Sequence, residues 1–293
     1  MPRIALVTAI AAHGTDDDIP PLAEALARLG VASETLAWDD PTVSWARFDA
    51  AVLRSPWDYT RRLPEFLAWC ERVAVTTQLL NPLHVVRWNT DKHYLAELAC
   101  AGVAVVESVF LEPGDDPAGF PDWDEYVIKP TVSAGSRDTQ RYVRAERPAA
   151  VEHARALLAA GRSVLAQPYL HEVDEHGETA LLYFDGIFSH AIRKAALLTR
   201  GEAPTSHLFA PERIAAREPD PAERAAADRI VALLPRLLGL GAPLPYARVD
   251  LLPSADGPRL LELELTEPSL FFTHAPGAAD RFAQALRARL GAR

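Results

Sequence analysis

The residues whose types and spacing best suit chemistry lie in a strongly alternating segment near the C-terminal end of the sequence. Residues 246–265 read YARVDLLPSADGPRLLELEL. Because side chains alternate along a β-strand, Arg248 shares a face with Asp250, and Glu262 shares one with Glu264. Folded as a hairpin, the segment would bring three carboxylates together, and these repel one another unless a cation lies among them. Oxygen donors without His or Cys suit Mg²⁺, so the segment predicts a metal site; the alternative is a solvated amphipathic hairpin.

A second group of residues has the types that bind phosphate. Lys129 ends the strand-like segment YVIKP, and a run of small residues follows it, namely Ser133, Ala134, Gly135 and Ser136. Small residues let backbone N–H groups approach phosphate oxygens, and the lysine adds a positive charge. Taken alone, the pattern also fits an ordinary β-turn. Lys92, at the start of a helix-like segment, by itself also fits a surface lysine.

A third segment has the features of a strand end that binds a nucleoside. Residues 164–172 read VLAQPYLHE, and the apolar run breaks at Gln167-Pro168. A broken strand leaves backbone amide and carbonyl groups free to hydrogen-bond an adenine edge. Glu172 would accept hydrogen bonds from ribose hydroxyls; the alternative is a solvated glutamate at the end of an ordinary strand.

The elements that must position these groups fall into two parts. In the first part strands alternate with helices, which predicts a parallel sheet covered by helices. The strands are expected at 3–10, 31–37 and 49–53, and the helices at 20–30 and 63–73. Ligands bind at the loops that follow such strands, so the segment Arg54–Tyr59, RSPWDY, is a candidate ligand-binding loop.

The second part combines a few helices with strands that are mostly joined by short turns. This pattern predicts an α+β arrangement with antiparallel hairpins. The strands are expected at 103–110, 126–129, 141–143, 164–169, 179–184, 187–193, 246–252 and 259–265, and the helices at 90–101, 149–160 and 221–238. The predicted fold class is therefore α/β followed by α+β.

The composition limits the classes of function. The 293 residues carry a formal net charge of −10, which argues against nucleic-acid binding. The sequence has no run of about 18 uncharged apolar residues, so no transmembrane helix is expected. Its first residues read as a strand followed by acidic residues and not as a signal peptide. Cys70 and Cys100 form no motif and are expected to be buried thiols of a cytoplasmic protein.

Taken in chain order, these segments resemble the ATP-grasp superfamily, in the branch similar to glutathione synthetase and the ribosomal S6 glutamate ligases. The resemblance covers residues 89–293. It implies a two-subdomain ATP-grasp fold after an N-terminal pre-ATP-grasp domain with a parallel sheet. The implied boundaries are 1–88 for the first domain, 89–165 for the central subdomain and 166–293 for the C-terminal subdomain.

The resemblance also implies a role for each residue that matches a motif of the superfamily. The phosphates of ATP would be bound by Lys92, Lys129 and the small loop Ser133–Ser136. The adenine hinge would be Gln167, Pro168, Tyr169 and Leu170, with Glu172 as the ribose-binding acid. The ligands of Mg²⁺, or of Mn²⁺ in its place, would be Asp250, Glu262 and Glu264. The sequence departs from the usual pattern at Glu264, where Asn is common, and at Ala134, which replaces a loop glycine.

The implied reaction is the ATP-dependent activation of a small amino-acid-like carboxylate as an acyl phosphate, which a nitrogen then attacks. The transferring phosphoryl group would be held by Arg248 and by Lys194 or Arg193. The substrate would contact Arg54, Ser55, Trp57, Asp58, Tyr59 and Ser269.

Three segments, LRSPWDY, VRWNTDK and ELELTEPSLF, resemble one actinobacterial-type subgroup of the superfamily. This resemblance implies an intramolecular attack that closes the ring of D-cycloserine from O-ureido-D-serine. The alternatives are an intermolecular carboxylate–amine ligase and a nucleotide-binding protein without catalysis. Retention of three carboxylates and two lysines argues against the latter, because a degenerate site tends to lose charges that repel one another. A homodimer is expected from the superfamily.

Overall fold

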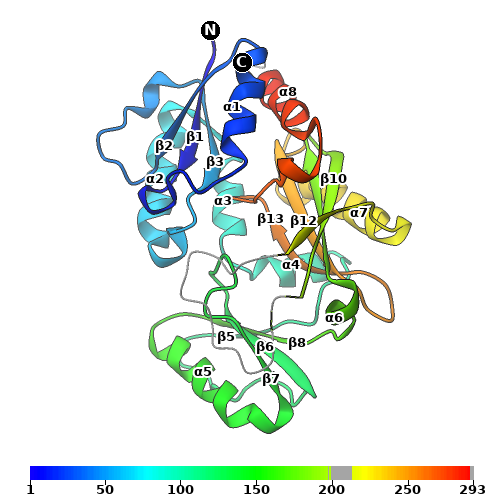
Figure 1. Ribbon diagram of the computed structural model, residues 1–293. Coiled ribbons are helices and arrows are strands. Elements are labelled where there is room, and N and C mark those ends of the chain that lie inside the picture. Colours follow the sequence, from blue (N-terminus) through cyan, green and yellow to red (C-terminus); the bar gives the residue numbers. More distant parts are fainter. Residues whose placement is uncertain (197, 199–212, 291–293) are drawn as a thin grey trace.

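Three β-sheets, one from each successive part of the chain, organise the computed structural model, which describes residues 1–196, 198 and 213–290 (Figure 1). The first sheet is parallel, with the strand order β2-β1-β3-β4. Its strands are β1 Arg3–Thr8, β2 Ala32–Ala37, β3 Ala50–Ser55 and β4 Gln78–Leu80, and its helices are α1 Ile19–Arg28 and α2 Leu63–Thr76. Every residue of β3 is buried, as expected for a central strand covered on both faces. The predicted parallel sheet is confirmed.

The second sheet is antiparallel, with the order β5-β8-β6-β7. Its strands are β5 Val109–Leu111, β6 Glu125–Pro130, β7 Gln140–Val143 and β8 Val164–Pro168, and α5 Arg147–Ala159 covers one face. The short helices α3 Leu83–Asn89 and α4 Tyr94–Cys100 connect it to the first sheet. Because β8 belongs to this sheet as far as Pro168, the implied boundary at residue 165 cuts through a strand.

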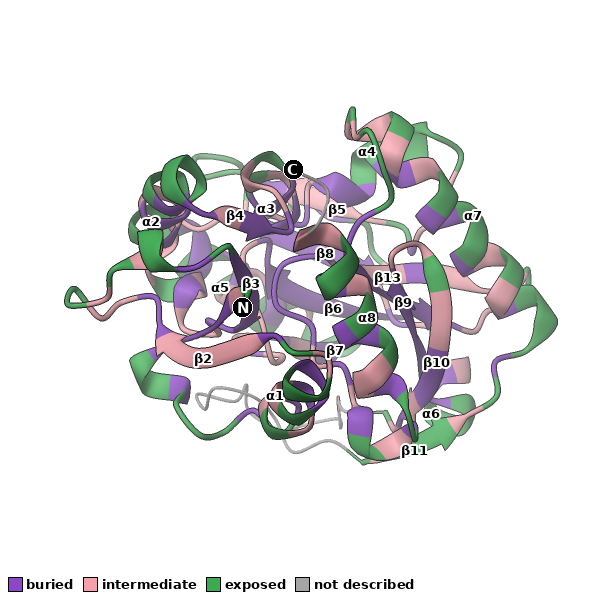
Figure 2. Ribbon diagram, turned by 90° about the horizontal axis from the view of Figure 1, so that it is seen from above, coloured by how far each residue is buried: buried purple, intermediate pink, exposed green. Residues whose placement is uncertain are grey.

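The third sheet is also antiparallel, with the order β11-β10-β9-β12-β13. Its strands are β9 Glu178–Phe184, β10 Ile187–Lys194, β11 Ile214–Arg217, β12 Tyr246–Leu252 and β13 Arg259–Glu264. The helices of this part are α6 Glu172–His176, α7 Pro221–Leu237 and α8 Ala278–Leu290. In Figure 2 most strands are buried, and the helices around them have exposed outer faces. Among the described residues, no helix has both the length and the apolarity needed to span a membrane.

The first and third sheets share one hydrophobic core. Phe282 and Leu286 of α8 pack with Leu22 of α1, and the same cluster includes Phe184 and Tyr246 of the third sheet. Figure 1 shows α8 beside α1. The C-terminal helix thus fixes the N-terminal sheet against the third sheet, so the loops of one can form a site with the strands of the other.

Several predicted elements differ from those observed. The helix expected at 90–101 is confined to α4, because residues 90–93 form a turn in which the Asp91 carboxylate accepts the His93 N–H. The strand expected at 103–110 is reduced to β5. The helices α3, α6 and α8 and the short strands β4 and β11 were not predicted. Cys70 is buried as expected, but Cys100 is exposed.

Candidate active site

The candidate active site is a cavity of about 500 Å³ lined by residues from all three sheets and their loops. Most of the predicted site residues line it. From the predicted nucleotide site these are Lys92, Lys129, Ser133, Ala134, Gly135, Ser136, Gln167, Pro168, Tyr169 and Leu170. From the predicted metal, catalytic and substrate sites they are Asp250, Glu262, Glu264, Lys194, Arg248, Trp57 and Ser269.

The hairpin β12–β13 forms one wall of the cavity. Its register places Asp250 opposite Glu262 and Arg248 opposite Glu264, so the predicted charged faces coincide. Alternation along each strand sends the intervening apolar side chains into the core on the other side. The arrangement is thus built by the local sequence pattern.

Two buried side chains fix the end of β13. The Asn89 amide donates to the Leu263 carbonyl at 2.7 Å and accepts the Leu265 N–H at 2.7 Å. The Tyr94 hydroxyl accepts the Leu263 N–H at 3.0 Å. Because side chains alternate, holding Leu263 and Leu265 in this way holds the two glutamates of β13 toward the cavity.

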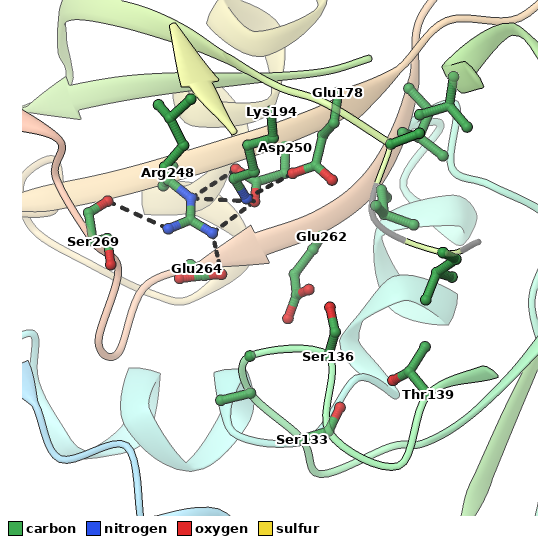
Figure 3. Close-up of a pocket in the computed structure, with 18 of the residues that line it drawn as sticks. Ser133, Ser136, Thr139, Glu178, Lys194, Arg248, Asp250, Glu262, Glu264 and Ser269 are labelled. Atoms are coloured by element: carbon green, nitrogen blue, oxygen red, sulfur yellow. Dashed lines mark hydrogen bonds and ion pairs between the residues drawn. The ribbon is translucent and has the colours of Figure 1, made fainter. Parts of the chain in front are cut away.

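Cations of the chain lie among these carboxylates (Figure 3). Arg248 Nε donates to Asp250 Oδ1 at 2.8 Å, and Arg248 Nη2 donates both to Asp250 Oδ2 at 2.8 Å and to Glu264. Lys194 Nζ, from β10, donates to Asp250 at 2.8 Å and to Glu178 at 2.7 Å. Two cations therefore face three carboxylates in this part of the wall.

Burial and the neighbouring charges shift the pKa values of the carboxyl groups in this wall. Burial raises the pKa of Glu264 to about 8 and that of Glu178 to about 7, despite the nearby Arg248 and Lys194. Burial acts in the same direction on Asp250, but the adjacent Arg248 and Lys194 outweigh it and hold the pKa of that carboxyl well below its ordinary value. The wall could therefore accept further positive charge.

The donor set suits a hard divalent cation. Asp250, Glu262 and Glu264 offer only oxygen ligands on one face of the hairpin, as Mg²⁺ prefers. Their side chains are paired with Arg248, Lys194 and Lys92, and in the part of the chain that the structure describes no three acidic, His or Cys side chains converge closely enough to hold a metal ion. Metal binding would thus compete with these ion pairs.

The two predicted phosphate-binding lysines are buried beside the small loop. Lys92 Nζ donates to the Ser133 carbonyl at 2.9 Å and lies 2.8 Å from Glu262. Burial lowers the pKa of Lys129 to about 8, with Lys92 adding repulsion and Glu262 opposing it. Two ammonium groups near one carboxylate form a locally positive site that suits phosphate.

The small loop has the backbone conformation typical of a ligand-binding turn. Gly135 has φ 62° and Ser136 has φ 58°, both left-handed. Glycine adopts this conformation freely, whereas for Ser136 it costs about 1 kcal/mol. Figure 3 shows Glu262 pointing into the cavity toward this loop. Strained residues of this kind cluster at ligand sites.

The predicted adenine hinge lines the apolar end of the cavity. Gln167 donates to the Ser108 hydroxyl at 3.0 Å, which orients the strand end. The apolar side chains around it are Val106, Val127, Leu170, Val173, Leu252 and Leu261. Glu172 differs from the prediction: it is the first residue of α6 and does not line the cavity.

Arg193 also differs from the prediction. Its guanidinium donates to the carbonyls of Glu175 and His176, outside the cavity. Since Arg193 and Lys194 are neighbours on β10, alternation sends only one of them inward, and that residue is Lys194. Lys194 alone remains a candidate for the predicted catalytic pair with Arg248.

Only Trp57 of the predicted loop Arg54–Tyr59 lines the cavity. Arg54 is fully buried, donates to the Pro268 carbonyl at 2.8 Å and lies 3.9 Å from Asp16 and Asp18. The other three side chains are also engaged elsewhere: Ser55 donates to Thr8, Asp58 accepts the Trp38 indole N–H at 2.9 Å, and the Tyr59 hydroxyl bonds Glu267. Apart from Trp57, the predicted side chains of this loop therefore contact neighbouring segments and do not line the cavity.

Several lining residues were not predicted. Asp16, Asp17 and Asp18 reach the cavity from the β1–α1 loop, and Glu178, Glu267, Phe271 and His274 also line it. The Asp18 carboxylate accepts the backbone N–H groups of 270 and 272 at 2.6 and 2.8 Å, which ties this loop to the segment after β13. The triple Asp after the first strand was the available signal.

Solved structures of low sequence identity share the whole fold. The ATP-grasp ligase PsnB with its minimal precursor has a TM-score of 0.64 at 20% identity, covering 98% of this chain and 99% of that one. The D-alanine–D-alanine ligase from Bacillus anthracis with ATP has a TM-score of 0.65 at 13% identity, covering 99% of each chain. The protein therefore has the ATP-grasp fold.

Closer relatives identify the family. Residues 4–81 match the family model described as the N-terminal domain of D-cycloserine synthetase DcsG. The cycloserine biosynthesis protein DcsG of Streptomyces lavendulae is 45% identical over 296 residues, covering 98% of each sequence. The crystal structure of D-cycloserine synthetase DcsG has a TM-score of 0.93 at 44% identity, covering 98% of this chain and 99% of that one. The chain belongs to the D-cycloserine synthetase family, and it is an ATP-dependent ligase.

Proposed function

We propose that this protein forms D-cycloserine by activating the carboxylate of O-ureido-D-serine with ATP and closing the ring within the same molecule. The observation that carries the proposal is the 45% identity to the cycloserine biosynthesis protein over 98% of both sequences. The cavity of about 500 Å³ supports it, because it gathers lysines, carboxylates and an apolar end in one site.

The distribution of residues supports one orientation of ATP. The apolar end, which Gln167, Pro168, Tyr169 and Leu170 line, takes the adenine. The opposite end takes the phosphates, because Lys92, Lys129 and the loop Ser133–Ser136 supply charge and small residues there. Asp250, Glu262 and Glu264 would hold Mg²⁺, which when bound neutralises the charge that develops on the transferring phosphate.

The reaction begins when the substrate carboxylate attacks the γ-phosphate and forms an acyl phosphate. Arg248 and Lys194 lie on the inner face of the third sheet and hold the transferring phosphoryl group and the carboxylate. The acidic loop Asp16–Asp18 faces the same space, so it attracts the ammonium group of an amino acid. A small zwitterion fits such a mixed wall better than a polymer does.

The alternatives differ from this proposal in what they need for turnover. An intermolecular ligase releases ADP only when a separate amine is added, and a non-catalytic protein releases none. We expect O-ureido-D-serine alone to give ADP and D-cycloserine, and added amines to change neither yield. ADP release that requires an added amine would establish the intermolecular ligase instead.

Removal of the Lys129 charge should weaken ATP binding. The lysine is buried beside the phosphate end of the cavity, and a hydrogen bond to a charged group contributes about 1–3 kcal/mol. We therefore expect Lys129→Ala to raise the Kd for ATP, measured by titration calorimetry, by about 5- to 150-fold. An unchanged Kd in a folded variant would contradict the assignment.

The pH dependence of the wild-type protein serves as the control for this prediction. Burial lowers the pKa of Lys129 to about 8, so the free protein carries this charge below pH 8 and loses it above. Bound phosphate favours the charged form. The affinity for ATP should therefore fall as the pH rises from 7 to 9, and this fall should be absent in Lys129→Ala.

A further inference from the structure

One buried carboxylate of the cavity has a different environment from the buried acidic residues that are paired with cations. Glu178, Asp250, Glu262 and Glu264 each form an ion pair with Lys194, Arg248 or Lys92. Within residues 1–196, 198 and 213–290, Glu267 forms no salt bridge, and its side chain accepts a hydrogen bond from the neutral hydroxyl of Tyr59. It is nonetheless buried, with 8% of its surface exposed, and it lines the cavity.

We propose that Glu267 is the general base that removes the proton from the attacking nitrogen during ring closure, an inference that rests on the proposed function. Glu267 follows β13 by three residues and lines the same cavity as the predicted metal ligands. The Trp57 indole donates to its backbone carbonyl at 3.2 Å, and Tyr59 holds its carboxylate. Trp57 and Tyr59 of the segment Arg54–Tyr59 thus position Glu267, although only Trp57 lines the cavity.

The chemistry requires a base at this step. The nitrogen that enters the ring carries a carbonyl group, so its lone pair is delocalised and it is a weak nucleophile until its N–H proton leaves. In the step, the bond from this nitrogen to the acyl carbon forms, and the bond from that carbon to the phosphate oxygen breaks. Phosphate leaves with the electron pair, and the proton passes to the Glu267 carboxylate. Cyclisation leaves the carbamoyl group on the ring nitrogen. Water then attacks the carbamoyl carbon, the bond from that carbon to the ring nitrogen breaks, the nitrogen takes a proton, and the group leaves as carbamic acid, which decomposes to ammonia and carbon dioxide.

The surroundings of Glu267 keep it able to accept a proton near neutral pH. The titratable or charged groups that act on it are Tyr59 from the 3₁₀ turn after β3, Lys92, Glu262 from β13, and Arg248 and Tyr246 from β12. Burial raises the pKa of Glu267 to about 7, the Tyr59 hydrogen bond opposes that rise, and Lys92 and Arg248 also lower it while Glu262 raises it. A base is most effective when its pKa lies near the working pH.

The test compares three readouts in Glu267→Gln and wild type: ADP release, capture of the acyl phosphate by hydroxylamine as a hydroxamate, and D-cycloserine formation. Glutamine has the same shape and still accepts the Tyr59 hydrogen bond, so the fold should persist. We expect hydroxamate yield to stay within threefold of wild type and D-cycloserine formation to fall at least about 100-fold, the scale of general-base catalysis.

A second variant, Tyr59→Phe, separates a base from a residue that only shapes the wall. Loss of the hydroxyl removes a contact that lowers the Glu267 pKa, so the acid limb of the kcat profile should move to higher pH. The inference would be overturned if Glu267→Gln formed D-cycloserine at the wild-type rate, or if the acid limb of Tyr59→Phe did not move. Either outcome would leave the proposed function intact. No ADP from O-ureido-D-serine with the wild-type protein would overturn both.

Discussion

Replacement of Glu262 by glutamine should abolish turnover while leaving the protein folded. Glu262 lies opposite Asp250 in the hairpin as a predicted metal ligand, and it is 2.8 Å from Lys92, a predicted phosphate-binding lysine. A neutral amide can still accept the Lys92 hydrogen bond, but it binds Mg²⁺ much more weakly than a carboxylate does. We expect kcat to fall at least 100-fold, about 3 kcal/mol in activation free energy, in assays of ADP release at 5–10 mM Mg²⁺.

The matched control is Glu172→Gln, which makes the same chemical change in a glutamate that does not line the cavity. Its kcat should stay within twofold of wild type, and the unfolding temperatures of both variants should be close to that of wild type. Normal turnover by Glu262→Gln would show that this carboxylate is not needed and would rule out the three-carboxylate metal site.

Replacement of Arg248 by methionine should cost both activity and stability. Arg248 binds the buried Asp250 through two nitrogens and also pairs with Glu264, and its side chain is 5% exposed. Removing one partner of a buried pair typically costs about 3–5 kcal/mol; because Asp250 keeps its contact with Lys194 while Glu264 loses Arg248, the lower part of that range applies here. We expect the free energy of unfolding, measured in urea, to fall by about that amount, and ADP formation to be lost.

Arg193→Met provides the comparison for Arg248→Met. Arg193 bonds two backbone carbonyls outside the cavity, so its loss should lower the free energy of unfolding by about 1 kcal/mol or less and should leave kcat within twofold of wild type. Equal effects of the two substitutions on both measurements would contradict the placement of Arg248 at the centre of the site.

The fold and the hairpin could be predicted from the sequence because their signals are local. Alternation over 246–252 and 259–264 determined which charged residues share a face, and the observed register agrees. The alternation of strands and helices before residue 80 likewise predicted the parallel sheet. The same rule, applied to β10, would have separated Lys194 from Arg193 at the outset.

The substrate side of the site could not be predicted in the same way, because long-range contacts form it. Arg54 is directed to the carbonyl of Pro268, more than two hundred residues later, and no local pattern indicates this. Asp16, from the first sheet, lines a cavity shared with the third sheet because α8 packs the first sheet against the third. The homodimer, the cytoplasmic location and the use of Mn²⁺ stay predictions.

We propose that this one cavity uses ATP to close a ring within a single small molecule. The most direct test is a turnover assay of the purified wild-type protein with ATP, Mg²⁺ and O-ureido-D-serine, without any added amine, in which ADP and D-cycloserine are both quantified. We expect the two products in a ratio of one to one. ADP without D-cycloserine, or no ADP above the rate seen without substrate, would contradict it.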